Sequence, residues 1–294
     1  MTDSAVGGPP GTASPVAALA TMPGDQRPAA AGGGNRTGAA RRFTAMTGVQ
    51  LAVIAVAVAI WWYISDVASA GSVPSPARTL SELAALLGTS VLWTAVGQTA
   101  TTWLIGIAVC AAVGIPGGLL IGASHFATDS TRLTIDFVRN IPPVALVPLG
   151  LLLWGPTRSM VLLLVISGTI WPIVIQSIYA ARQSEPQLRD VARVFQLGRR
   201  WWLTHIFLPG VTPFVMTGLR VAATICLLLT ITGELFGGAP GVGTQIQSAQ
   251  VGNDNPQMYA YVIMAALLGL LVNTLIWIAQ RRLLGWHPSF RKRA

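Results

Sequence analysis

The stretch Asp190-Val191-Ala192-Arg193-Val194-Phe195-Gln196-Leu197-Gly198, followed by Ile206-Phe207-Leu208-Pro209, is a charged segment between two strongly apolar runs. Helical spacing places Leu188, Val191, Ala192 and Phe195 on one face and directs Arg189, Asp190 and Arg193 away from it. Gly198 can supply the left-handed residue that ends this helix, and a second short helix is expected from 199 to 207. The segment 182–209 therefore predicts two short helices with an apolar side and a basic side.

The composition is that of a membrane protein. Of the 294 residues, 52% are hydrophobic and 10% are charged, whereas soluble domains carry roughly 25% charged residues. The net charge of +9 would by itself suit nucleic acid. The basic residues lie between the apolar runs, however, as the positive-inside rule describes. We therefore expect a chain surrounded by membrane lipid, with no nucleic-acid partner.

The apolar runs predict an all-α, polytopic membrane protein of about six transmembrane helices. A helix needs about 20 apolar residues to cross the hydrocarbon. Six runs qualify: 45–65, 92–122, 133–153, 159–180, 211–235 and 257–280. Because the third run contains Pro142, Pro143 and Pro148, it is expected to be irregular. The extracytoplasmic segment 66–91 is expected to contain a short interfacial helix, Thr79 to Leu87.

The distribution of basic residues orients these spans. With both termini in the cytoplasm, 16 of the 19 Lys and Arg lie inside, Arg78 and Arg158 lie outside, and Arg220 falls within the fifth span. Residues 1–42, rich in Gly, Ala and Pro, predict a disordered cytoplasmic tail. Residues 283–294 predict a basic cytoplasmic tail, and 92–282 the transmembrane core.

Several residues inside the predicted spans are candidates for function. Glu234 is an acid within or at the end of a span, either bonded to backbone amides at the outer interface or lining a gate. Arg220 either attracts an anionic substrate or extends toward the membrane surface. Pro142 and Pro143 interrupt regular helix, so residues 140–149 can line a pathway. Asp136 and Arg139 are one turn apart and suit a local ion pair.

Other reactive residues do not cluster. Cys110 and Cys226 lie in apolar runs and are interpreted as small buried hydrophobes. His125, His205 and His287 are scattered, so the sequence predicts no metal site and no cofactor on this chain.

The 182–209 segment resembles the permease signature of type I ATP-binding-cassette importers. That signature runs Glu-Ala-Ala, three residues, Gly, nine residues, then Ile-any-Leu-Pro. Here Asp190-Val191-Ala192 occupy the first triplet, and Ile206, Leu208 and Pro209 match the end at the same spacing. The signature's Gly falls on Gln196, and a glycine follows two residues later at Gly198.

Further stretches resemble the nitrate, sulfonate, taurine and bicarbonate branch of these permeases. One is Arg139-Asn140-Ile141-Pro142-Pro143-Val144-Ala145-Leu146-Val147-Pro148. Another is Gly233-Glu234-Leu235-Phe236-Gly237, followed by Gly241-Val242-Gly243. The resemblance covers residues 70 to 285.

The resemblance implies the membrane subunit of an importer in the plasma membrane. Two permease subunits, here expected to be two copies of this chain, form the pathway, two cytoplasmic ATPases hydrolyse ATP, and an extracytoplasmic binding protein delivers the solute. The 182–209 segment resembles the helices that couple to the ATPase, through Leu188, Arg189, Asp190, Ala192, Arg193, Gly198, Ile206, Leu208 and Pro209. The implied solute is a small anion such as an aliphatic sulfonate, taurine or nitrate.

The chain itself is not expected to be an enzyme. It has no Gly-rich phosphate loop, and its only lysine is Lys292, so ATP and Mg are expected on the partner ATPase. The alternative functions are a secondary transporter or channel not driven by ATP, and a membrane enzyme. The first would show paired intramembrane ionisable residues or an internal repeat, and the second a cluster of catalytic groups. The 182–209 segment could also simply rest on anionic lipid.

Overall fold

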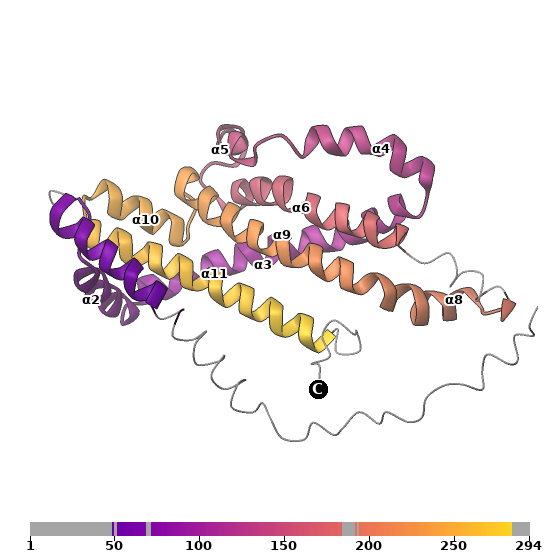
Figure 1. Ribbon diagram of the computed structural model, residues 1–294. Coiled ribbons are helices and arrows are strands. Elements are labelled where there is room, and N and C mark those ends of the chain that lie inside the picture. Colours follow the sequence, from indigo (N-terminus) through magenta and orange to yellow (C-terminus); the bar gives the residue numbers. More distant parts are fainter. Residues whose placement is uncertain (1–48, 50–51, 69–71, 184–191, 193, 284–294) are drawn as a thin grey trace, which may run out of the picture. The chain divides into compact units, whose positions relative to one another are not determined.

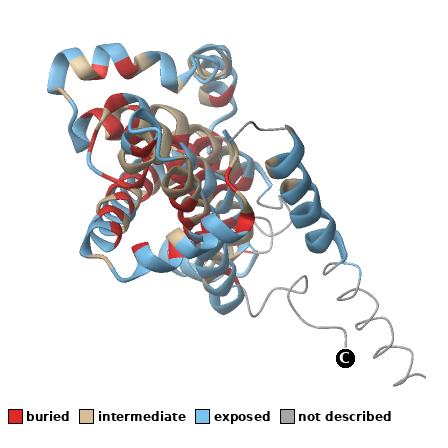
Figure 2. Ribbon diagram, turned by 90° about the vertical axis from the view of Figure 1, so that its left-hand side faces the viewer, coloured by how far each residue is buried: buried red, intermediate tan, exposed pale blue. Residues whose placement is uncertain are grey.

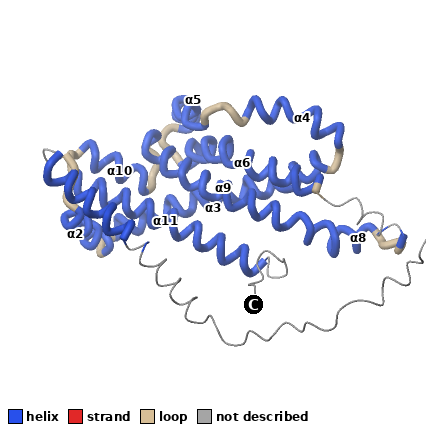
Figure 3. The backbone as a smooth tube through the Cα atoms, viewed as in Figure 1, coloured by secondary structure: helices blue, strands red, loops and turns tan. Residues whose placement is uncertain are grey.

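The computed structural model describes residues 49, 52–68, 72–183, 192 and 194–283. The chain divides into residues 1–56 and residues 57–294. Within the first unit, Val49 and residues 52–56 are described and are helical. The predicted tails, 1–42 and 283–294 apart from Leu283, lie outside the described residues. The described part of the chain contains helices and loops without a β-strand (Figure 3), which confirms the all-α prediction.

The second unit is built from helices of very different length. In chain order they are η2 (Ile64–Ala68), α2 (Pro76–Leu87), α3 (Ser90–Gly122), α4 (His125–Val138), η3 (Pro143–Leu146), α5 (Val147–Trp154), α6 (Arg158–Arg182), α8 (Arg199–Trp202), η4 (Leu203–Phe207), α9 (Leu208–Gly237), α10 (Val242–Val251) and α11 (Asn255–Leu283). The helix α2 lies where a short helix was predicted, from 79 to 87, and its interfacial position remains a prediction. It begins where Ser75 caps it, accepting a hydrogen bond from the Arg78 N–H at 3.4 Å.

Four helical segments are long and apolar enough to cross a membrane: Ser90–Gly122, Arg158–Arg182, Arg199–Val251 and Asn255–Leu283. They contain the predicted second, fourth, fifth and sixth spans. The predicted first span overlaps a shorter apolar helix, Ala52–Val67. With the bent pair α4 and α5 counted as one span, the described residues hold up to five spans. Six spans therefore remain a prediction.

The third span is broken, as its prolines predict. The segments His125–Val138 and Pro143–Trp154 meet at an angle of 70°. Pro142 and Pro143 lie at this break, and neither has an N–H to continue the helical hydrogen bonds. Consequently α4 is a separate amphipathic helix, and only the second half of the predicted run, α5, is strongly apolar.

Helix α6 is the centre of the second unit, and α3 and α9 both pack along it (Figure 1). Its residues Leu164, Val165 and Ile173 are fully buried, and buried residues gather where the three helices meet (Figure 2). Glycines on both partners face α6: Gly106, Gly114, Gly118 and Gly122 from α3, and Gly218, Gly233 and Gly237 from α9. Small residues let helix backbones approach closely in lipid, where the packing of surfaces drives association.

This packing predicts a difference between two neighbouring glycines of α3. A Cβ atom at Gly118 would lie 2.6 Å from the carbonyl oxygen of Val174, whereas one at Gly117 would meet nothing within 4 Å. Overpacking costs about 1–3 kcal/mol, so Gly118→Ala is expected to lower the thermal midpoint of the detergent-solubilised protein. The control Gly117→Ala should leave the midpoint unchanged or raise it, since Ala is the better helix former. Equal midpoints would contradict the close contact of α3 with α6.

Candidate functional site

The first part of the 182–209 segment ends in a left-handed turn. Ala192 and Val194 are helical, and the Leu197 N–H donates to the Ala192 carbonyl at 3.0 Å. Gln196, between them, has φ of +49°. In the Schellman motif, the second residue after the helix cap donates its N–H to a carbonyl of the last helical turn, and the residue before the donor is left-handed. Gln196 therefore takes the left-handed position, at the place where the importer signature has glycine.

The prediction that Gly198 ends the helix is wrong. Gly198 has φ of −60° and ψ of 145°, an extended conformation, and is the N-cap of α8. Its carbonyl accepts from the Trp202 N–H at 3.0 Å. The reason is one of register: the helix has already ended at Gln196, so Gly198 begins the next helix instead.

The second predicted short helix is present and leads directly into α9. Helix α8 (Arg199–Trp202) continues as a π-helical turn, η4, which continues as α9. Pro209 lies in the first turn of α9, directly after the π-helical turn, and it has no N–H to donate back to η4. Ile206 is half-buried on η4, and Leu208 is exposed at the start of α9. Two ring pairs stiffen this run: Trp201 on His205 and Trp202 on Phe207.

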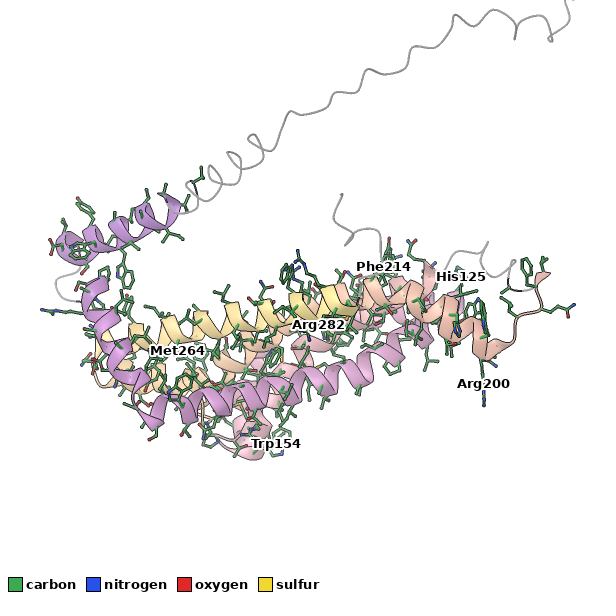
Figure 4. All side chains as sticks on the ribbon, turned by 90° about the horizontal axis from the view of Figure 1, so that it is seen from below. His125, Trp154, Arg200, Phe214, Met264 and Arg282 are labelled. Carbon is green, nitrogen blue, oxygen red and sulfur yellow. The ribbon has the colours of Figure 1, made fainter. Side chains whose placement is uncertain are left out.

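Apolar and basic side chains are both exposed along this segment. Val194 is 77% exposed and Phe195 69%, whereas Ala192 is buried, so the two described residues of the predicted apolar face differ in burial. Arg199 and Arg200 are exposed beside them, and Figure 4 shows Arg200 pointing away from the helix bundle. Four other predicted residues, Leu188, Arg189, Asp190 and Arg193, lie outside the described residues.

Glu234 lies at the opposite end of α9 from this segment and is almost fully buried. Its Oε2 accepts from the Thr99 hydroxyl of α3 at 2.8 Å and from the Gly243 N–H of α10 at 3.0 Å. The Thr99 hydroxyl in turn accepts from the Val242 N–H at 2.9 Å. The carboxylate thus ties α3 and the first turn of α10 to α9. Of the two roles considered for Glu234, bonding to backbone amides or lining a gate, the first is seen in the bond to the Gly243 amide.

The glycine-rich turn between α9 and α10 makes room for this carboxylate. A side chain at Gly241 or Gly243 would overlap with Glu234. Gly238 has φ of +67°, a conformation that favours glycine, and it ends α9. The Thr244 hydroxyl donates to the carbonyls of Glu234 and Ala239. Thr99 was not found from the sequence, because it is one of several threonines at the start of an apolar run and lies 135 residues from its partner.

The other candidate pathway residues lie apart from Glu234. Arg220 is exposed on α9 and donates from Nη2 to the Asn273 side chain of α11 at 3.2 Å. Pro142 precedes η3, and Pro143 packs on Gly168 of α6. A cavity of about 330 Å³ adjoins this break and is lined by Arg139, Asn140, Gly168, Trp171, Pro172 and Ile175. The cavity therefore lies next to the break that Pro142 and Pro143 make between α4 and α5.

Cys110 and Cys226 are buried free thiols. Among the residues that the structure describes, no group of three His, Cys, Asp or Glu is placed to hold a metal ion.

The bonds of Thr99 predict a specific loss of stability. Thr99→Val removes a hydroxyl that serves both Glu234 and the Val242 N–H, and leaving such buried groups unpaired costs about 1–3 kcal/mol. We expect a lower thermal midpoint in detergent. Thr101→Val is the matched control, because that exposed hydroxyl bonds only the Gly97 carbonyl of its own helix. A loss of similar size in both variants would argue against the tie through Glu234.

The left-handed turn at Gln196 predicts a stabilising substitution. A non-glycine residue in this conformation costs about 1–2 kcal/mol, so Gln196→Gly should slow hydrogen exchange at the Leu197 amide about fivefold or more. Gln183→Gly is the control, because Gln183 ends α6 with φ of −76° and gains nothing from glycine. Faster exchange at Leu197 in Gln196→Gly would contradict the assigned turn.

Comparison with known proteins identifies the family. Residues 114–284, more than half of the chain, match the family described as binding-protein-dependent transport system inner membrane component. The nitrate import permease protein NrtB of Synechocystis sp. is 27% identical over 237 residues, 78% of this chain and 86% of that protein. The putative aliphatic sulfonates transport permease protein SsuC of Bacillus subtilis is 27% identical over 252 residues, 85% of this chain and 91% of that protein.

The SsuC protein of Escherichia coli is 29% identical over 235 residues, 79% of this chain and 89% of that protein. These relatives are matched over most of their length by the same helical region that contains the 182–209 segment and Glu234. The chain therefore belongs to the family of binding-protein-dependent inner membrane transport components, the permeases of ATP-binding-cassette importers, and is a multi-pass protein of the plasma membrane.

Proposed function

We propose that this chain forms the translocation pathway of an ATP-driven importer for a small anion, and that its 182–209 segment docks on a cytoplasmic ATPase. One observation carries the proposal: an exposed apolar pair, Val194 and Phe195, comes just before a helical run that carries exposed Arg199 and Arg200 and continues into α9. Exposed large apolar side chains next to arginines are typical of a protein–protein contact.

The same run offers a mechanical path across the membrane. Helix α9 has 30 residues and so extends about 45 Å at a rise of 1.5 Å per residue. It begins at the docking segment, packs along α6, and ends at Glu234, which holds α3 and α10. If closure of the ATPases displaced α8, α9 would tilt. The hydrogen bonds of Glu234 at its far end would then be strained. Access on one side of the membrane would thus be linked to nucleotide state on the other.

The proposed assembly follows from the family. It contains two copies of this chain, two ATPase subunits that hold ATP and Mg, and an extracytoplasmic binding protein. Docking sets the orientation: the 182–209 segment and both termini face the cytoplasm, and the Glu234 end faces outward. The relatives' names support a small anion, nitrate or an aliphatic sulfonate, and taurine belongs to the same chemical class. Arg220 is the arginine proposed to attract this anion on its way.

Co-purification tests the docking. Val194→Asp with Phe195→Asp replaces two exposed apolar side chains by charges, so the full-length protein purified in mild detergent should lose its ATPase partner, as detected by mass spectrometry. The matched control is Val251→Asp, because Val251 is 80% exposed on α10 near the other end of α9, and it should retain the ATPase. Retention by all variants would refute docking through this segment, and absence of any ATPase from the wild-type sample would refute the importer.

A further inference from the structure

A second charged feature lies between α4 and α6, away from Glu234. A cavity of about 450 Å³ separates the two helices there. It is lined from α4 by Thr128, Asp129, Arg132, Ile135, Asp136 and Arg139, and from α6 by Ile175, Ile178, Tyr179 and Arg182. The four charged residues of α4 recur at three- and four-residue spacing, so one helix face directs all of them into the crevice.

The charges in this crevice do not cancel. Three arginines and two aspartates give a net charge of +1. Asp136 and Arg139 pair at 3.1 Å, which confirms the predicted local ion pair. Arg182 Nη2 lies 3.4 Å from Nδ1 of His125. Within the described residues, Arg132 has no ion-pair or hydrogen-bond partner. Arg132 and Arg182 therefore leave positive charge available, one from each wall.

The outer face of α4 is apolar. Phe126, Leu133 and Phe137 are 82%, 80% and 72% exposed. An amphipathic helix that turns its apolar face outward and its charges inward suits a position in lipid with a polar cleft behind it. The crevice lies beside the last turn of α6, whose final residue, Arg182, is also the first residue of the 182–209 segment.

We propose that this crevice binds the phosphate headgroup of an anionic phospholipid from the cytoplasmic leaflet, an orientation that rests on the proposed function. Arginine pairs of this kind recognise phosphate through charged, bidentate hydrogen bonds. Basic pockets between transmembrane helices on the cytoplasmic side take such headgroups. The apolar walls, Ile135, Ile175 and Ile178, favour a lipid over a free oxyanion, because an acyl chain would cover them and a free ion would not.

Native mass spectrometry of the full-length protein, titrated with phosphatidylglycerol, tests the site. Each arginine near an anionic headgroup contributes about fivefold to affinity, so Arg132→Gln with Arg182→Gln should weaken binding about twenty-fivefold. Arg78→Gln, an exposed arginine on α2, is the control and should change nothing. Asp129→Asn removes a negative charge from the crevice and should strengthen binding about fivefold, an effect that misfolding would not produce.

Three results would overturn the proposal. They are equal phosphatidylglycerol binding by wild type and the double variant, equal wild-type binding of zwitterionic phosphatidylcholine, and displacement of the lipid by millimolar inorganic phosphate or methanesulfonate. Displacement by these ions would mean that the crevice binds an oxyanion from a free solute and not from a lipid. The ATPase co-purification is scored separately: phosphatidylglycerol bound by a wild-type protein that captures no ATPase would sink the importer proposal and leave this site standing.

Discussion

The close approach of α3 and α9 to α6 is the interaction on which the rest of the structure depends. In a bilayer the hydrophobic effect does not drive helices together, so backbone approach through small residues has to supply the contact. Glycines of both outer helices face α6, and Gly168 of α6 faces back toward Leu229 and Pro143. Because α9 is held along its length by this packing, its two ends occupy defined places.

Those two ends carry the features that matter for transport. At one end, the run α8–η4 presents exposed apolar and basic side chains, among them Trp201, Arg199 and Arg200. At the other, the Glu234 carboxylate collects bonds from α3 and α10. One long helix, α9, therefore joins the exposed contact surface to the buried hydrogen bonds of Glu234. A subunit that links ATP hydrolysis on one side of the membrane to solute access on the other requires such a connection. The charged crevice between α4 and α6 is a third polar feature.

Local patterns in the sequence predicted the features that depend on neighbours along the chain. Long apolar runs located α3, α6, α9 and α11, the amphipathic pattern located α2, and prolines located the break before α5. The left-handed residue is Gln196, at the position where the signature has glycine, whereas residue preference assigned that conformation to Gly198. Propensity misled there because glycine is favoured in both conformations, and only the Leu197–Ala192 hydrogen bond decides which residue ends the helix.

Contacts between distant segments could not be predicted in this way. The glycines at four-residue spacing in α3, Gly114, Gly118 and Gly122, were a visible signal for close helix packing, but their partner helix was not. The tie from Glu234 to Thr99 joins α9 to α3 across most of the core, and nothing local distinguishes Thr99 from its neighbours. The α4–α6 crevice likewise appears only once the broken third span turns the charged face of α4 toward Arg182.

Photo-crosslinking from position 195 in native membranes tests the central claim most directly. With a photoreactive phenylalanine analogue in place of Phe195, the account predicts a covalent adduct with a cytoplasmic ATPase, identified by its Gly-rich phosphate loop. The same analogue at position 251 should give no such adduct. Adducts from position 195 with lipid alone, or with an extracytoplasmic protein, would contradict the proposed docking and orientation.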